Sequence, residues 1–176
     1  MNQQKTPRTT AIQSFMLVLL RVAIGWHFLY EGYVKITSPS WSAAGYLDQA
    51  QGPLAGFFHQ MAANKAALTA VNLLNMWGLA VVGLGLMLGL LTRLSCLGAV
   101  LLLALYYAAN PPWIAVLPRF AEGNYLVVDK NLVELVAVIT VLVFDTGRIA
   151  GLDVLLGNWR QRRRARRAAA ADTPPV

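Results

Sequence analysis

The stretch that decides the fold is LTAVNLLNMWGLAVVGLGLMLGLLTRLSCLGAVLLLALYYAA, residues 68–109, in which Arg93 is the single charge. Counting to the nearest charges, 27 uncharged residues separate Lys65 from Arg93, and 25 separate Arg93 from Arg119. Each run exceeds the roughly 20 residues that an α-helix needs to cross a hydrocarbon core of about 30 Å. The whole chain is 57% hydrophobic and 13% charged, which is too apolar for an ordinary soluble domain. These patterns predict an integral membrane protein.

The apolar segments predict an all-α, four-helix membrane bundle. We expect its spans at about 12–30, 68–91, 94–109 and 131–144. The loops 36–66 and 110–130 carry many aromatic residues, which a solvated linker would not. We therefore expect short amphipathic helices there, lying on the outer membrane surface over the bundle. Residues 1–158 would form this single membrane domain, and residues 159–176 a basic, disordered cytoplasmic tail.

The positive charges predict the orientation of the chain. Six of its fifteen Lys and Arg residues are arginines between Arg160 and Arg167, and with both termini inside, ten basic residues lie inside against four outside. This asymmetry predicts that both termini of a multi-pass protein lie in the cytoplasm. The tail lacks the aromatic platforms of nucleic-acid binders, so we expect the lipid bilayer and no nucleic acid as its partner.

Two ionisable residues, Arg21 and Glu134, fall inside predicted spans. Charges in hydrocarbon are expensive, and they usually face a protein interior or a polar cavity. Arg21 has two interpretations, a structural pairing within the bundle or a functional contact with an anion. For Glu134 the alternatives are proton transfer, or an ion pair with a base such as His27, Lys130 or Arg21 that fixes the bundle.

Glycines recur at helical spacing on the first two spans. Gly25 and Gly32 share a face of the first helix, and Gly78, Gly85 and Gly89 form a stripe on the second. Small residues let membrane helices approach closely, because lipid provides no hydrophobic force that drives them together. We expect these glycines to serve helix packing.

Polar residues near the outer ends of the helices predict one shared pocket. Candidate catalytic residues are His27, Glu31 and Glu134, which could move protons. Candidate substrate-binding residues are Arg21, Lys35, Asn72, Asn75, Tyr107, Asn110 and Asn131, and Tyr106 lies at the same depth. Hydrogen-bond donors, a carboxylate, a histidine and aromatic walls together suit a quinone head group. The residue set implies no haem, metal or nucleotide cofactor.

Three ordered segments carry a family resemblance. They are RVAIGWHFLYEGYVK at 21–35, GLMLGLLTRLSCLGA at 85–99 and NYLVVDKNLVELVAV at 124–138. With this order and spacing the chain resembles the DoxX/DoxD family of small four-helix prokaryotic membrane proteins. The resemblance implies a place in the inner membrane of a prokaryotic cell. SPSWSAAGYL at 38–47 and YYAANPPW at 106–113 resemble the DoxD side, the membrane subunit of thiosulfate:quinone oxidoreductase.

The resemblance implies two-electron transfer from thiosulfate to a quinone co-substrate, together with a DoxA-like second subunit or another redox partner. A homo-oligomer is a further arrangement to consider. Thiosulfate would approach from outside, where Lys35, Lys65, Arg119 and Lys130 can attract an anion. Two other functions stay open: a non-catalytic scaffold or assembly factor for a redox or envelope complex, and a transporter of small solutes or lipids.

Overall fold

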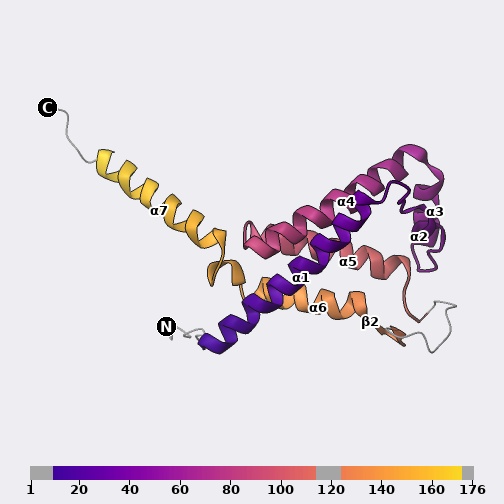
Figure 1. Ribbon diagram of the computed structural model, residues 1–176, viewed down its shortest axis with the longest axis horizontal. Helices are drawn as coiled ribbons and strands as arrows, with labels where there is room; N and C mark the ends of the chain where they lie inside the picture. The colour runs from indigo at the N-terminus through magenta and orange to yellow at the C-terminus, as the bar shows by residue number, and fades with distance from the viewer. Residues whose placement is uncertain (1–9, 114–123, 172–176) are drawn as a thin grey trace, which may run out of the picture.

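The computed structural model describes residues 10–113 and 124–171, and most of them are helical (Figure 1). The helices are α1 (Ala11–Thr37), α2 (Ala44–Asp48), α3 (Ala55–Ala63), α4 (Lys65–Leu88), α5 (Thr92–Ala109), α6 (Lys130–Val143) and α7 (Leu152–Ala171). A two-stranded antiparallel hairpin, β1 (Asn124–Tyr125) and β2 (Val128–Asp129), precedes α6, and a short 3₁₀ helix, η1 (Thr146–Arg148), follows it.

Within the described residues, α1, α4 and α5 are long and apolar enough to cross a membrane, which confirms three of the four predicted spans. They carry large apolar side chains on their outer surfaces, among them Trp26 and Trp77. Helix α6 forms where the fourth span is predicted and has 14 residues. At about 1.5 Å per residue it is about 21 Å long, shorter than a hydrocarbon core.

The four longer apolar helices form a closed ring. Helix α1 packs extensively on α4, α4 on α5, α5 on α6, and α6 less extensively on α1. Phe28, Leu79, Leu86, Leu103 and Val138 fill the centre of this ring. Successive helices run in opposite directions, so α2, α3 and the hairpin gather at one end of the ring, hereafter the cap end (Figure 1). The start of α1, the α4–α5 turn, η1 and α7 lie at the other, the tail end.

The contact between α1 and α4 brings backbone against backbone. A Cβ atom on Gly83 would lie 2.3 Å from the amide nitrogen of Leu29, and one on Gly32 would lie 2.6 Å from that of Ala80. Gly25 is equally closed, which confirms its predicted packing role. Gly83 was not on the predicted glycine stripe, although it is the residue of α4 that makes this approach possible.

The three glycines of the predicted stripe on α4 do not lie in this contact with α1. A Cβ on Gly78 would meet nothing within 4 Å, so the predicted packing role of Gly78 is wrong within the described residues. Gly85 faces Ser95 of α5 rather than α1. Gly89 ends α4 with φ of 62°, the left-handed conformation that glycine adopts without steric cost.

The cap end agrees with the sequence for residues 36–66, where α2 and α3 form over the bundle. They bury a small core of Ala43, Leu47, Ala50 and Phe58 together with Ala109 at the end of α5. In the second predicted cap segment, residues 124–129 form a hairpin instead of a helix, and the prediction for residues 114–123, with Arg119, lies outside the described residues.

At the tail end, α7 is helical through Ala171, whereas a disordered segment was predicted from residue 159. Arginine and alanine, which dominate this segment, are among the strongest helix formers, and the structure follows that local preference. The structure thus has helix at residues 159–171, where the sequence predicts disorder, and residues 172–176 lie outside the described part of the chain.

Candidate functional site: a cavity beneath the cap helices

A cavity of about 450 Å³ lies between the helix ring and the cap helices. Its walls are mostly apolar and aromatic, with Phe28, Trp41, Phe58, Leu79 and Leu103 among them. Its polar lining consists of His27, Glu31, Lys35, Ser42, Tyr46, Asn75, Tyr106, Lys130, Asn131 and Glu134. A chamber of this size, apolar with a few converging polar groups, has the ordinary character of a small-molecule site.

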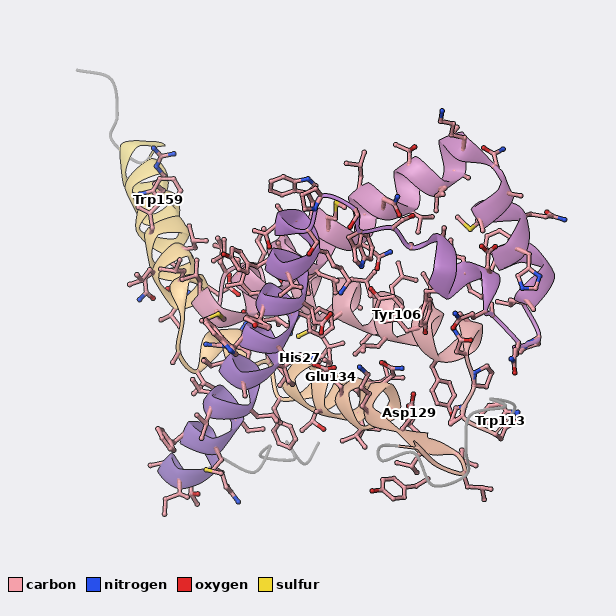
Figure 2. The ribbon with its side chains drawn as sticks, turned by 45° about the vertical axis from the view of Figure 1, so that its right-hand side comes forward. His27, Tyr106, Trp113, Asp129, Glu134 and Trp159 are labelled. Atoms are coloured by element: carbon pink, nitrogen blue, oxygen red, sulfur yellow. The ribbon has the colours of Figure 1, made fainter. Side chains whose placement is uncertain are left out.

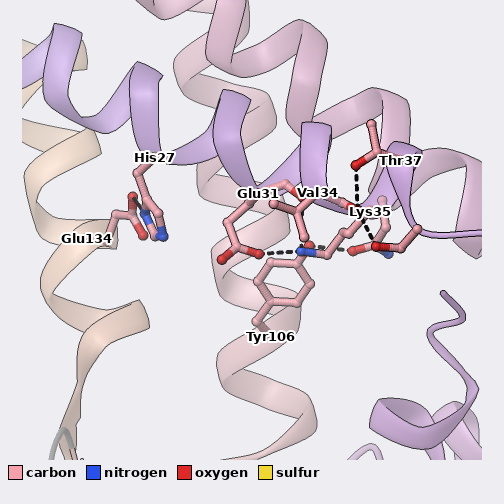
Figure 3. A network of polar contacts seen from close by, with 9 residues as sticks. His27, Glu31, Val34, Lys35, Thr37, Tyr106 and Glu134 are labelled. Atoms are coloured by element: carbon pink, nitrogen blue, oxygen red, sulfur yellow. Dashed lines mark hydrogen bonds and ion pairs between the residues drawn. The ribbon is translucent and has the colours of Figure 1, made fainter.

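One polar contact of the cavity joins α1 to α6. Nδ1 of His27 lies 2.7 Å from Oε1 of Glu134, although 107 residues separate the two in sequence (Figures 2 and 3). The His27 side chain is 48% exposed and that of Glu134 13% exposed. The pair therefore stands at the seam between α1 and α6, with its carboxyl towards the interior and its imidazole towards the outside.

A second ion pair lies one turn further along α1. Glu31 and Lys35 are four residues apart on the helix, and their charged ends are in direct contact (Figure 3). The Lys35 ammonium also lies 5.6 Å from the centroid of the Trp41 ring, which closes the cavity on the cap side. These contacts hold Lys35 at the edge of the cavity, with its ammonium paired to the Glu31 carboxylate.

Hydrogen bonds hold several of the other polar groups in place. The Tyr106 hydroxyl donates to Oδ1 of Asn75, and the Tyr46 hydroxyl donates to the Tyr106 carbonyl at 2.9 Å. Burial raises the pKa of Tyr46, so this phenol stays a hydrogen-bond donor at neutral pH. Asp129 is buried before α6, where it accepts a hydrogen bond from the Asn131 side chain at 2.9 Å. The amide groups that face the chamber thus have fixed orientations.

The structure brings together six of the ten predicted site residues in this cavity: His27, Glu31, Lys35, Asn75, Asn131 and Glu134. The other four do not line it. The Asn72 side chain accepts a hydrogen bond from the Ala43 amide at 2.8 Å, and the Tyr107 hydroxyl donates to the Val127 carbonyl at 2.7 Å. These two residues support the cap, and Asn110 ends helix α5.

Arg21 lies at the tail end, away from the cavity. Its side chain is 2% exposed, and Nη1 donates to the carbonyls of Thr146 at 2.9 Å and Ala150 at 2.7 Å. Helix α1 is thereby tied to the segment that leads into α7. This geometry supports the structural interpretation of Arg21, and we no longer assign it to the substrate site.

Sequence reasoning did not assign Trp41, Tyr46 and Lys130 to the pocket. Trp41 and Tyr46 come from the cap segment, whose fold over the bundle has no periodic signal in the sequence. Lys130 had a sequence signal, because it begins the same helix as Asn131 and Glu134 and lies one turn from the carboxylate. Asp129, which orients Asn131, was also missed, although an aspartate just before a helix is a frequent N-cap.

The chemistry available here is acid–base chemistry at the edge of an apolar chamber. An imidazole in contact with a carboxyl can accept a proton from a bound ligand or donate one to it. Nearby polar groups can orient the oxygen atoms of the ligand. No group of three or more His, Cys, Asp and Glu residues that could hold a metal ion occurs in the described ranges.

This fold and site define a helical membrane protein with a mostly apolar cavity, lined by a few polar groups, at one end of its helix bundle. The DoxX family model matches residues 16–110, more than half of the chain, and the protein belongs to the DoxX family. The matched region begins in α1, contains both cap helices and ends after α5. It therefore includes all the lining residues of the cavity except those of α6. Comparison with curated proteins and with solved structures gives no match.

Proposed function

We propose that this DoxX family protein is the membrane subunit of a quinone-linked oxidoreductase and that the cavity binds the quinone. The observation that carries the proposal is the His27–Glu134 contact of 2.7 Å on the edge of a mostly apolar chamber of about 450 Å³. In this proposal α6 is the fourth membrane span, which gives the complete four-helix bundle.

The shape and position of the chamber support a lipid-soluble ligand. Helix α6 packs less extensively on α1 than on α5, and His27 is half exposed at that seam. An isoprenoid quinone could therefore pass laterally from the bilayer, with its tail left between lipid chains. Its head group would meet the aromatic walls, and the side-chain amides of Asn75 and Asn131, each with a second N–H to donate, would orient its carbonyls.

Reduction of a quinone to a quinol takes up two electrons and two protons. His27 and Glu134 would deliver the protons to the two quinone oxygens and be reprotonated from the aqueous phase at the cap end. The electrons must come from an external two-electron reductant. Thiosulfate fits the resemblance to the DoxD side: two thiosulfate ions join through a new S–S bond and release two electrons. Lys35 and Lys130 would attract such an anion to the cavity.

The proposal includes an orientation. Positive charges concentrate in α7 and near the tail end, and such charges are retained on the cytoplasmic side of bacterial membranes. The tail end and both termini would then face the cytoplasm, and the cap end would face outward in the inner membrane. A DoxA-like or other redox partner would bind on the cap side, and a second copy of the chain is a further partner to test.

The test measures quinone binding separately from turnover. Protein in neutral-lipid nanodiscs is titrated with a short-chain benzoquinone, and quenching of tryptophan fluorescence reports binding. We expect Glu134→Gln and His27→Gln each to weaken binding at least about tenfold, the loss of one charge-assisted hydrogen bond. Asp48→Asn is the matched control, because Asp48 is an exposed acid of the cap that does not line the cavity.

Turnover with thiosulfate is then followed as absorbance loss of the quinone. Saturable binding lost in the two site variants supports the proposal, and thiosulfate-dependent reduction identifies the reductant. No binding to the wild type, or equal binding to all variants, contradicts it. Co-purification of an intact partner without quinone binding would favour the scaffold, and solute flux into sealed vesicles without redox change would favour the transporter.

A further inference from the structure

Helix α7 carries two features that the cavity does not use. Its first half has a stripe of apolar residues at helical spacing, Leu152, Leu155 and Trp159, of which Leu155 is 64% and Trp159 51% exposed. Its second half contains the six arginines between Arg160 and Arg167. The stripe is thus not covered by the described chain, and it leads directly into a dense positive charge.

The start of α7 is held firmly against the bundle. The Asp153 carboxylate accepts hydrogen bonds from the amides of Leu91 at 2.8 Å and Thr92 at 2.9 Å, where α5 begins. The Asp153 amide donates to the carbonyl of Gly89 at 2.8 Å, where α4 ends. The Cα atoms of Gly89 and Gly151 face each other so closely that neither has room for a side chain.

These contacts set the level at which α7 leaves the bundle. Helices α4 and α5 turn around at this level (Figure 1), so a membrane crossed by these two helices would have its tail-end surface here. From that point α7 extends away from the ring, and its 20 residues correspond to about 30 Å. The apolar stripe therefore begins at the depth where lipid head groups meet the acyl chains.

We infer that α7 is an amphipathic helix that binds anionic lipid head groups on the tail-end surface of the membrane. Leu155 and Trp159 would enter the boundary between head groups and acyl chains, where tryptophan is enriched. The arginines would bind lipid phosphates, since a guanidinium donates two parallel hydrogen bonds to a phosphate. Arg163 already lies over the Trp159 ring, 4.1 Å from its centroid, so the two can engage one lipid together.

Lipid fits these observations better than RNA does. Binding of single-stranded nucleic acid relies on several aromatic faces on which successive bases stack. The described part of α7 offers one aromatic ring, and Arg163 covers one of its faces. An acidic protein would account for the arginines, whereas the apolar stripe at membrane level has its natural partner in the lipid boundary.

The experiment follows a spin label on α7 in the full-length protein. The label is attached at Asn158→Cys, an exposed position beside Trp159, and the buried Cys96 is replaced by alanine. The protein is placed in nanodiscs of phosphatidylcholine alone or with phosphatidylglycerol. We expect the label to lose mobility in the anionic discs and to regain it in high salt, because salt screens exposed charges.

Charge variants separate electrostatics from helix content. Each arginine near an anionic surface strengthens association about fivefold, so replacing Arg162, Arg163 and Arg164 by glutamine predicts about a hundredfold loss. Replacing the same three by lysine keeps the charge and should restore most of the lipid response. Trp159→Ala should leave the salt response intact and make the label more accessible to water.

Equal label mobility in neutral and anionic discs would overturn the inference. So would immobilisation that occurs only when an RNA oligonucleotide or an acidic protein is added. A far-UV spectrum with unchanged helix content shows that the glutamine variant has lost charge and not structure. Quinone binding is recorded on the same samples, and because α7 is at the opposite end from the cavity, it should be unaffected by any of these changes.

Discussion

The close approach of α1 and α4 gives the sharpest test of the fold. A Cβ atom on Gly83 would lie 2.3 Å from the Leu29 amide nitrogen and 2.7 Å from the Gly25 carbonyl oxygen, whereas ordinary contact begins at 3.4 Å. In Gly83→Ala the two backbones must therefore separate by about 1.1 Å, the difference between 3.4 and 2.3 Å. Backbone atoms cannot rotate away as a flexible side chain can, so the strain falls on the whole contact.

The magnitude follows from two opposing effects. Overpacking of this kind costs about 1–3 kcal/mol, and a gap near 1 Å elsewhere along the contact forfeits up to about half of the dispersion energy there. Alanine, however, favours the helix over glycine by about 1 kcal/mol. Gly78→Ala is the matched control, because it makes the same change in the same helix where a Cβ meets nothing within 4 Å.

We expect Gly83→Ala to be less stable than Gly78→Ala by about 1–3 kcal/mol, which is the overpacking cost alone, because both variants gain the helix preference of alanine and it cancels in the comparison. Unfolding in mixed micelles with increasing dodecyl sulfate, followed by far-UV circular dichroism, measures the difference. The displaced α1 carries His27, so Gly83→Ala should also weaken quinone binding. Equal unfolding midpoints for the two variants would refute the assigned contact.

Three further predictions concern the tail end. Arg21→Met removes two buried hydrogen bonds and should lower the free energy of unfolding by about 1–3 kcal/mol, with quinone affinity unchanged in the titration described above. Although burial raises the pKa of Asp153, hydrogen bonds from Thr92 and Leu91 outweigh it and hold that pKa below its ordinary value of 3.8. Asp153 should therefore stabilise the fold above about pH 4, and Asp153→Asn should lose that contribution at pH 7 but differ less from wild type as the pH falls below 3.8. Leu91 has φ of 48°, a strained value for leucine, so Leu91→Gly should raise the unfolding free energy by about 1 kcal/mol.

The membrane spans could be predicted because a long run of uncharged residues is visible in the sequence itself. The residues at which the helices begin and end could be predicted less well. Helix α1 continues to Thr37 and not to about residue 30, since the Glu31–Lys35 pair supports another two turns. Helix α4 stops at Leu88 because Gly89 adopts a left-handed conformation. Glycine after an apolar run is a recognised stop signal, but the strained backbone of Leu91 has no signature in the sequence.

The sequence predicted the level of each site residue along its helix, but not the side of the helix on which its side chain lies. His27 and Glu134 lie at one level along their helices, and the structure brings them into contact. Asn72 and Tyr107 lie at a similar level but turn towards the cap. Sequence position fixes the height of a side chain in a span, whereas its direction depends on which neighbour each helix packs against. That neighbour is set by contacts such as Gly83 with Leu29, distant in sequence.

In the sequence, Arg21 and Glu134 look alike, because each is a charge within an apolar segment. Their surroundings in the structure differ. Nη1 of Arg21 donates to two backbone carbonyls at the tail end, so this side chain stabilises the junction between α1 and the segment that leads into α7. Among the described residues Glu134 pairs with His27, which is half exposed, and both line a chamber with room for a ligand. A carboxyl used only for structure would be better served by a fully buried base or by backbone amides, as Asp153 is. The Glu134 carboxyl is instead paired with the exposed imidazole of His27 beside the cavity, where both groups can exchange protons with a ligand. This difference from Arg21 is the physical reason for proposing a reaction site at the cap end.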